Sequence, residues 1–378
     1  MLINEIPDDC LLAIFDYMVN LDHLINCYKV CVKWSNLITK RAKKVKYLID
    51  KIQVYSCFML IVIHFLIFSD HRSDSSDIVE LSPEIHLKAK HAIEFVRKQE
   101  SLKGLINRFD EPIEKYCDKL EMLSVNTINP NNLRNSSRIK QLDIWSYSLK
   151  ALERDAHYLP NLERLKIQIK APDYFYDGPV LEKLKILEFH FDFYPRKIFY
   201  GFMLMDLCPN LQSAHIFMNA TNWYFNETLK HECLQDLVIQ LDRLGYENDM
   251  DIRNDNWNNL KRLLMKYPNL KHLSLRDIWK LKDEHIEELV HILPNLVLLD
   301  VNACDKVTQR AADYVQDYCK RYGRSIKFYF KGNRDEIESD WPQSSSKSEV
   351  INRGFDFMKH CFFRDHIFLP RFLIPIDY

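Results

Sequence analysis

The sequence predicts an α/β protein in which short N-terminal helices precede a long array of parallel strands with helical returns. Two patterns support this fold class. An amphipathic helical pattern, NEIPDDCLLAIFDYM, opens the chain at residues 4–18, and a segment close to L-x-x-L-x-L recurs eight times between residues 118 and 301. The chain has 378 residues, 47% of them hydrophobic. That is enough apolar material for two domains or for one elongated array.

The overall composition argues against several classes of function. The formal net charge is −1, whereas a nucleic-acid-binding protein needs a surplus of lysine and arginine on one face. The chain has 7 glycines and neither a GxGxxG nor a GxxxxGK[ST] motif, which argues against a nucleotide-binding enzyme. It also has no GxSxG, Ser/His/Asp or catalytic cysteine signature. We therefore expect no enzymatic activity and no nucleic-acid partner.

Ten cysteines are scattered along the chain without a CxxC pair. Cys27 and Cys31 are four residues apart, but two thiols supply only half of a zinc site. Reduced, buried thiols in an intracellular protein explain the pattern better. The chain begins MLINEIPDD, which is no signal peptide. We expect a cytoplasmic or nuclear location, no cofactor and no metal.

The N-terminal block reads as three short helices. Pro7 suits the first turn of the first helix, where Asp8 and Asp9 complement the positive end of the helix dipole. A second helix carries Leu21 and Leu24, and a third ends in the basic run KRAKKVK at residues 40–46. We interpret this run as a helix cap and solvated face. The apolar side chains exceed what so small a core can bury, which predicts docking onto a partner.

The order of these residues resembles an F-box. The Ile6-Pro7 start, the Ile14-Phe15 pair, the Leu21-Asp22-x-Leu24 step and Val30-Cys31 followed by Trp34 all occur at the expected spacing, with mild departures at Met18 and His23. The resemblance covers residues 3–48. It implies binding to a Skp-type adaptor and, through the adaptor, to a cullin–RING ubiquitin ligase. The adaptor-binding residues that it implies are Ile6, Pro7, Leu11, Leu12, Ile14, Phe15, Val30, Cys31 and Trp34.

The repeated segments resemble leucine-rich repeats. Four copies begin with Pro-Asn-Leu, at residues 160, 209, 268 and 294, and weaker copies begin at residues 118, 137, 182 and 232. The period is mostly 19 to 27 residues and reaches 36 between Leu234 and Leu270. In such a solenoid, alternate leucines of each strand point into the core. Residues 283–293 and 308–319 read as helical returns, and Cys304 is expected to turn inward after its strand.

The non-leucine strand positions are expected to line the concave face. Their aromatic and oppositely charged side chains suit protein recognition, although each position alone is expected to be simply solvated. His190 and His215 lack the spacing of metal ligands. The predicted substrate-binding residues are Trp145, Arg164, Lys166, Glu188, His190, His215, Phe217, His272 and Arg276, with Asp300 and Asn302 on the same face.

Three segments fit neither pattern. Residues 54–69 carry no charge and would form a helix of about 24 Å, short of a hydrocarbon core of roughly 30 Å. They are a structural linker, a membrane span or a gene-model artefact. Residues 84–109 read as a helix capping the repeats. The apolar tail, residues 350–378, is expected to fold back as a cap or to lie in the concave groove.

The predicted domains are an F-box at residues 3–48, the apolar segment and polar linker at 49–83, a capping helix region at 84–116, degenerate leucine-rich repeats at 117–331, a linker at 332–349 and the tail at 350–378. The resemblance implies a non-catalytic substrate receptor of an SCF (Skp–cullin–F-box) ubiquitin ligase, with an unknown protein substrate. The alternative is a leucine-rich-repeat scaffold outside ubiquitination, with or without a membrane tether at residues 54–69.

Overall fold

The structure is a computed structural model. It describes residues 5–18, 26–42, 47–49, 93, 96, 97, 99, 102–108, 110–169, 175–191, 198–218, 222–241, 257–278, 280–302, 304–336 and 372–373. The N-terminal block contains α1 (Asp8–Tyr17) and α3 (Val32–Ala42), and residues 26–28 between them are helical. The predicted second helix otherwise falls on residues 19–25, outside the described residues.

The main sheet of the described residues has twelve strands, in the order β13-β12-β11-β10-β8-β6-β5-β4-β3-β2-β1-β14. Every neighbouring pair is parallel except β1 and β14, which are antiparallel. The strands are β1 (Tyr47–Ile49), β2 (Gly104–Asn107), β3 (Met122–Val125), β4 (Gln141–Ile144), β5 (Arg164–Ile169), β6 (Ile186–Phe191), β8 (Ser213–Met218), β10 (Asp236–Leu241), β11 (His272–Arg276), β12 (Leu298–Asp300), β13 (Lys327–Tyr329) and β14 (Phe372–Leu373). Each of the eight repeated segments contains one of these strands.

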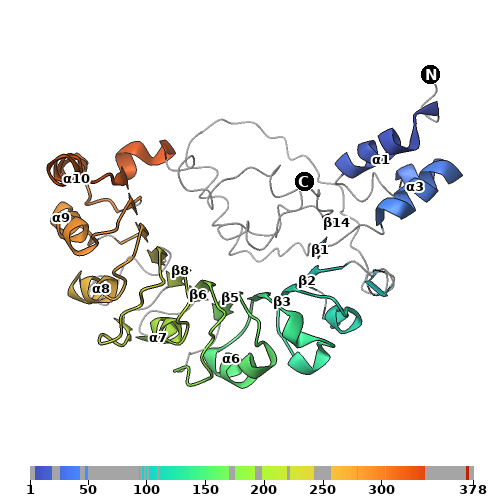
Figure 1. Ribbon diagram of the computed structural model, residues 1–378, viewed down its shortest axis with the longest axis horizontal. Coiled ribbons are helices and arrows are strands. Elements are labelled where there is room, and N and C mark those ends of the chain that lie inside the picture. Colours follow the sequence, from blue (N-terminus) through green and yellow to red (C-terminus); the bar gives the residue numbers. More distant parts are fainter. Residues whose placement is uncertain are drawn as a thin grey trace, which may run out of the picture.

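The sheet curves into an arc, with the strands on its inner side and the helices on its outer side (Figure 1). The outer elements are α6 (Leu149–Asp155), α7 (Gly201–Asp206), α8 (Trp257–Leu264), α9 (Asp283–Ile292) and α10 (Gln309–Tyr322), the 3-10 turns η2 (Ile113–Tyr116), η3 (Pro130–Asn132), η4 (Ser136–Arg138) and η5 (Ala156–Tyr158), and a two-stranded sheet of β7 (Ile198–Phe199) and β9 (Asn222–Trp223). The 3-10 turn η6 (Lys331–Glu336) follows β13 at the end of the arc (Figure 1). Helices α9 and α10 confirm the two predicted helical returns.

Local sequence signals fix the ends of the outer helices. Ser148 caps α6, its side chain accepting a hydrogen bond from the Ala151 N–H at 3.1 Å. Thr308 caps α10, which ends at Gly323 with a φ of 63°. Glycine adopts that left-handed conformation without a steric penalty from a Cβ atom. The side chain of Asp283, at the start of α9, accepts hydrogen bonds from the Thr308 N–H at 2.8 Å and the Thr308 hydroxyl at 2.7 Å. This contact ties two successive helices together.

The core lies between the sheet and the outer elements. Its central row consists of side chains that face one another in register from strand to strand and are at most 1% exposed: Leu105, Leu123, Leu142, Leu165, Leu187, Ala214, Leu237, Leu273 and Leu299. Cys304 is buried after β12, as predicted, and its thiol donates to the Leu275 carbonyl at 3.2 Å. Burying one leucine contributes about 1.5–3 kcal/mol, so the row supplies much of the stability of the array.

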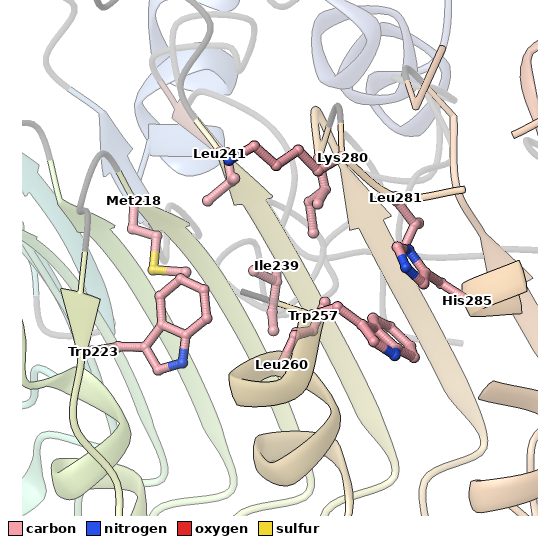
Figure 2. Close-up of a pocket in the computed structure, with 10 residues that line it drawn as sticks. Met218, Trp223, Ile239, Leu241, Trp257, Leu260, Lys280, Leu281 and His285 are labelled. Atoms are coloured by element: carbon pink, nitrogen blue, oxygen red, sulfur yellow. The ribbon is translucent and has the colours of Figure 1, made fainter. Parts of the chain in front are cut away.

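The core is incompletely filled near the carboxyl ends of β8, β10 and β11. An apolar pocket lies there, with the indoles of Trp223 and Trp257 on opposite sides of Ile239 and Leu260 (Figure 2). Residues 222–235, between β8 and β10, contain the short strand β9 and no helix.

Two ladders of side chains join neighbouring units along the sheet. The asparagines of the four Pro-Asn-Leu triplets each donate to a backbone carbonyl of the preceding unit: Asn161 to Ser137 at 2.7 Å, Asn210 to Glu182 at 2.7 Å, Asn269 to Glu232 at 2.9 Å and Asn295 to Pro268 at 3.0 Å. The repeated asparagine thus has a direct structural reason, because it satisfies a carbonyl that the neighbouring unit leaves unpaired.

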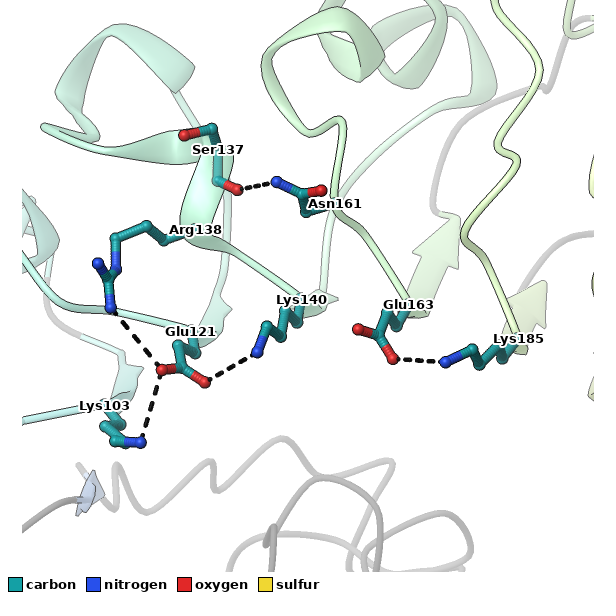
Figure 3. A network of polar contacts seen from close by, with 8 residues as sticks. All are labelled: Lys103, Glu121, Ser137, Arg138, Lys140, Asn161, Glu163 and Lys185. Carbon is teal, nitrogen blue, oxygen red and sulfur yellow. Dashed lines mark hydrogen bonds and ion pairs between the residues drawn. The ribbon is translucent and has the colours of Figure 1, made fainter.

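The second ladder is formed by charged residues that directly precede the strands. Glu121 pairs with Lys103 at 3.6 Å and with Lys140 at 3.4 Å, and Glu163 pairs with Lys185 at 2.9 Å (Figure 3). Exposed ion pairs of this kind add less than about 1 kcal/mol each. Their alternating signs keep like charges two strands apart and so favour the observed register.

The predictions for residues 84–109 and for the tail differ in how far the described residues test them. Residues 84–109 were predicted as one helix, and this is wrong at its end, because residues 104–107 form β2. Pairing of Leu105 and Ile106 with β3 outweighs their local helical pattern. The tail, residues 350–378, lies outside the described residues except for β14, which pairs with β1.

The apolar segment at residues 54–69 also lies outside the described residues. In the part of the chain that the structure describes, no helix combines the length and the apolar character needed to cross a membrane.

Candidate functional site

The two N-terminal helices form a small core of their own. Leu11 and Phe15 of α1 pack against Trp34 and Leu37 of α3, and all four side chains are buried. The rings of Phe15 and Trp34 meet edge to face, with centroids 5.2 Å apart. Leu11 and Phe15 are four residues apart and so lie on one face of α1. Among the predicted adaptor-binding residues, Leu11, Phe15 and Trp34 therefore support the helices from within.

Polar contacts fix the angle between the two helices. The Lys33 ammonium lies 3.2 Å from the Asp8 carboxylate and donates to the Ile6 carbonyl at 3.0 Å. The Arg41 guanidinium donates to the Met18 carbonyl at 3.2 Å. Arg41 lies in the last turn of α3, as the predicted cap requires, but it is buried, so the predicted solvated face does not include this residue. Its guanidinium satisfies a carbonyl at the end of α1.

The other predicted adaptor-binding residues lie at or near the surface. Ile14 is 42% exposed and Val30 is 57% exposed, Pro7 is also exposed, and Ile6, Leu12 and Cys31 are partly buried. Tyr28 and Val32, which are not among the predicted adaptor-binding residues, add to the exposed apolar surface. So much exposed apolar area on two short helices is typical of a protein-docking surface.

The inner face of the sheet carries the predicted substrate-binding residues in three rows. Lys166, Glu188 and His215 face one another on β5, β6 and β8. His190 and Phe217 lie two residues further along their strands and also face each other, with ring centroids 4.4 Å apart. Arg164, His272, Arg276 and Trp145 complete the set. The structure thus brings Lys166, Glu188, His190, His215 and Phe217 together on three adjacent strands.

Arg164 and Glu188 are buried and paired, so the expectation of single solvated side chains is wrong for them. Arg164 and Glu188 form a buried ion pair at 2.5 Å. Burial raises the pKa of Glu188, while Arg164 and Lys166 act against this increase. On β11, the ring of His272 lies 2.6 Å from the Asp236 carboxylate. These pairs join adjacent strands and could not be recognised from residues 24 and 36 positions apart.

Two hydrogen-bonded clusters lie towards the two ends of the inner face, and each contains a serine, an aspartate and an arginine. Near the first strands, the Ser124 hydroxyl donates to Asp143 at 2.6 Å and accepts from Arg108 at 2.8 Å, and the Arg108 guanidinium lies 4.5 Å from the centre of the Trp145 ring. The Trp145 indole N–H donates to Asp143 at 3.4 Å. Of this cluster, Trp145 alone belongs to the predicted substrate-binding residues.

Towards the other end, Asp300 accepts from the Ser274 hydroxyl at 2.6 Å, from Arg276 at 3.0 Å and from the Asn302 N–H at 3.0 Å. Asp300 is fully buried. A buried carboxylate is stable only with such partners. Both clusters therefore hold charged side chains in fixed positions on the inner face.

His215 gives the inner face a specific pH dependence. Burial, with added repulsion from Arg276, His190 and Lys166, lowers its pKa to about 3 from an ordinary value near 6.5. The unfolded chain therefore binds this proton at a higher pH than the folded chain. The resulting stability is complete above pH 6.5 and is lost as the pH falls from there towards 3, at up to about 1.4 kcal/mol per pH unit.

We expect the variant His215→Gln to lose this part of the pH dependence. Urea unfolding at about pH 7 and pH 4.5 should show a smaller acid-induced shift of the midpoint in His215→Gln than in the wild type. His157→Gln, which changes an exposed histidine, serves as the control and should keep the wild-type shift. Equal shifts in the wild type and His215→Gln would contradict the assignment.

The described residues hold no group of three or more His, Cys, Asp or Glu side chains placed to bind a metal ion. Cys27 and Cys31 are both free thiols.

Comparison with known proteins agrees with the geometry of the N-terminal block. Its compact helical pair and exposed apolar side chains define a protein-docking module. The family model of the F-box domain matches residues 3–46. The chain therefore contains an F-box domain, the module through which a protein binds the adaptor of an SCF ubiquitin ligase. No curated protein matches the chain.

Proposed function

We propose that the protein is a non-catalytic substrate receptor of an SCF ubiquitin ligase, and that its strands belong to degenerate leucine-rich repeats whose inner face binds the protein to be ubiquitinated. The F-box match is the observation that carries the proposal. The sequential parallel sheet, the central leucine row and the asparagine ladder support the assignment of the repeats.

The proposed mechanism is positional. The F-box holds the adaptor, the inner face holds a target, and a lysine of that target is kept near the ubiquitin-charged conjugating enzyme. Holding both on one body raises their effective concentration, so no residue of this chain needs to form or break a bond.

On the F-box, the exposed residues Pro7, Ile14 and Val30 are the proposed adaptor contacts. Leu11, Phe15 and Trp34 hold them in place, and Ile6, Leu12 and Cys31 lie at the border between these groups. This division follows the burial of each side chain, because a residue fully covered by its own domain has little surface left for a partner.

On the inner face, the proposed target contacts are the partly exposed residues Lys166, His190, His215, Phe217, His272, Arg276 and Trp145. The buried pair Arg164–Glu188 orients its neighbours. Fixed side chains lose little conformational entropy on binding, which favours a specific rather than an adaptable surface. The target class that fits is a folded protein or peptide with both charged and aromatic groups.

Co-expression with a Skp-type adaptor and a cullin tests the proposal. We expect the full chain to co-purify with both, and proteins captured by it to accumulate when the proteasome is inhibited. The double variant His190→Ala/Phe217→Ala should capture less of these target proteins but should still co-purify with the adaptor. A chain that binds no adaptor would instead favour the repeat scaffold, and recovery in the membrane fraction would favour the tethered form.

A further inference from the structure

The inner face carries an apolar patch towards the end of the arc where the last strands lie. Val238 of β10, Leu298 of β12 and Tyr329 of β13 form a cluster of their own, apart from the main core. The residues next to them along the strands, such as Leu237 and Leu299, belong to the main core. Because successive side chains of a strand point to opposite faces, the three clustered side chains point to the inner face.

These three side chains are covered although they point away from the core. Val238 is 1% exposed, Leu298 is 4% exposed and Tyr329 is 3% exposed. Side chains on the same face of a sheet cover one another's flanks, but their tips stay in contact with solvent unless another layer lies over them. The outer helices cannot supply this layer, since they pack on the opposite face of the sheet (Figure 1). The patch therefore has a cover of its own.

One segment of the chain joins the two ends of the arc. The turn η6 ends at Glu336 after β13, whereas β14 pairs with β1 at the opposite end (Figure 1). Residues 337–371 connect these two points. The sheet spans eleven steps between strands, about 53 Å in all, and 35 residues reach at most about 120 Å. The inner face is the shorter route, because a route along the convex side must also pass around the layer of helices.

The second part of this segment, residues 350–371, has the composition that such a cover needs. It contains five phenylalanines together with Ile367 and Leu369. It begins 14 positions after Glu336, an extended reach of about 45 Å that includes the patch. Apolar surface of this amount is unfavourable in water, and so is an open apolar patch on the inner face. Contact between the two removes both surfaces from solvent.

We propose that residues 350–371 of the same chain lie along the inner face from this patch towards β14, and that their apolar side chains cover Val238, Leu298 and Tyr329. The pairing of β14 with β1 tethers the far end of the segment. The segment therefore has a high effective concentration at the patch. A target that binds the inner face competes with it. This competition rests on the proposed function, whereas the docking of the segment does not.

Photocrosslinking in the full chain identifies the cover directly. The photoreactive amino acid p-benzoylphenylalanine in place of Tyr329 bonds to whatever lies against the patch, and mass spectrometry of the digested product identifies the bonded peptide. We expect a peptide from residues 350–371 of the same molecule. The same amino acid in place of Tyr322, which is 63% exposed on α10, is the control and should not bond to this segment. A peptide from elsewhere in the chain, from a second copy or from another protein would overturn the proposal, as would the absence of a bonded product.

Limited digestion with trypsin measures how firmly the segment docks. Trypsin can cleave after Arg353, Lys359 and Arg364, and docking should protect these sites. Val238→Glu places a charge in the patch and should speed these cleavages at least tenfold, because burying a charge without a partner opposes docking. Val297→Glu, at a valine that is 42% exposed, should cleave at the wild-type rate. Equal rates in Val238→Glu and the wild type would contradict docking at this patch.

Two further measurements separate the possible causes of each result. Thermal unfolding verifies that Val238→Glu folds, and if it does not, the photocrosslink, which leaves Val238 unchanged, decides. Co-purification with a Skp-type adaptor is measured on the same samples. Adaptor binding without the crosslink would refute the docking of the segment alone, whereas the crosslink without adaptor binding would refute the ubiquitin-ligase role alone.

Discussion

Replacing Ile14 by glutamate is expected to abolish co-purification with a Skp-type adaptor while the F-box stays folded. Ile14 is 42% exposed on α1 and takes no part in the core of Leu11, Phe15, Trp34 and Leu37. A charge at this position remains hydrated in the free protein, but in the complex it would be buried without a partner. We expect affinity for the adaptor to fall at least a hundredfold, measured by titration calorimetry or pulldown.

Two further variants separate docking from folding. Phe15→Ala should also lose the adaptor, but through unfolding, because removing a buried aromatic ring costs about 3–5 kcal/mol. Val180→Glu places the same charge on an exposed valine outside the F-box and should bind normally. Normal adaptor binding by Ile14→Glu would exclude Ile14 from the interface.

Replacing Asp206 by alanine is expected to destabilise the array by about 3–5 kcal/mol, which is the usual cost of leaving one charge of a buried pair without its partner. The Lys266 ammonium lies 2.5 Å from the Asp206 carboxylate, and their side chains are 1% and 11% exposed. The second carboxylate oxygen of Asp206 accepts from the Asn226 N–H at 3.2 Å. This pair links the end of α7 to the turn after α8, across 60 positions in the sequence.

The midpoint of urea unfolding is the appropriate measurement. Asp305→Ala, which breaks an exposed pair with Lys331 at 3.0 Å, is the matched control and should change stability by less than about 1 kcal/mol. The double variant Asp206→Leu/Lys266→Met should recover much of the loss, since it leaves no buried charge. Equal effects of Asp206→Ala and Asp305→Ala would show that burial adds nothing to the Asp206 pair.

The positions of the strands were predictable because the L-x-x-L-x-L pattern reports burial directly. Leu165 and Leu187, for example, were expected to point into the core, and both do. The four-residue spacing of Leu11 and Phe15 also separates them from Ile14, although all three are predicted adaptor-binding residues. Periodicity shows which side chains share a face, but not whether a partner or the domain itself covers that face.

The polar contacts of the inner face were not predictable in the same way. Arg164 and Glu188 meet only because β5 and β6 pair in one register. Ser124, Asp143 and Asp236 each occupy ordinary strand positions, and only the arrangement of several strands joins them to their partners. The pocket between Trp223 and Trp257 likewise joins residues of β9, β10 and α8, which no local pattern brings together.

The asparagine ladder determines how local unfolding of one unit affects the units beside it. Four units each supply a carbonyl to the asparagine of the next unit, and the unit that begins at Pro268 both donates through Asn269 and accepts from Asn295. If one of these units unfolds locally, the asparagine side chain of the next unit loses the carbonyl that accepts its hydrogen bond. Units farther away keep their hydrogen bonds. Damage therefore spreads from neighbour to neighbour along the arc, and the two ends of the sheet, each with a neighbour on only one side, are where such loosening begins.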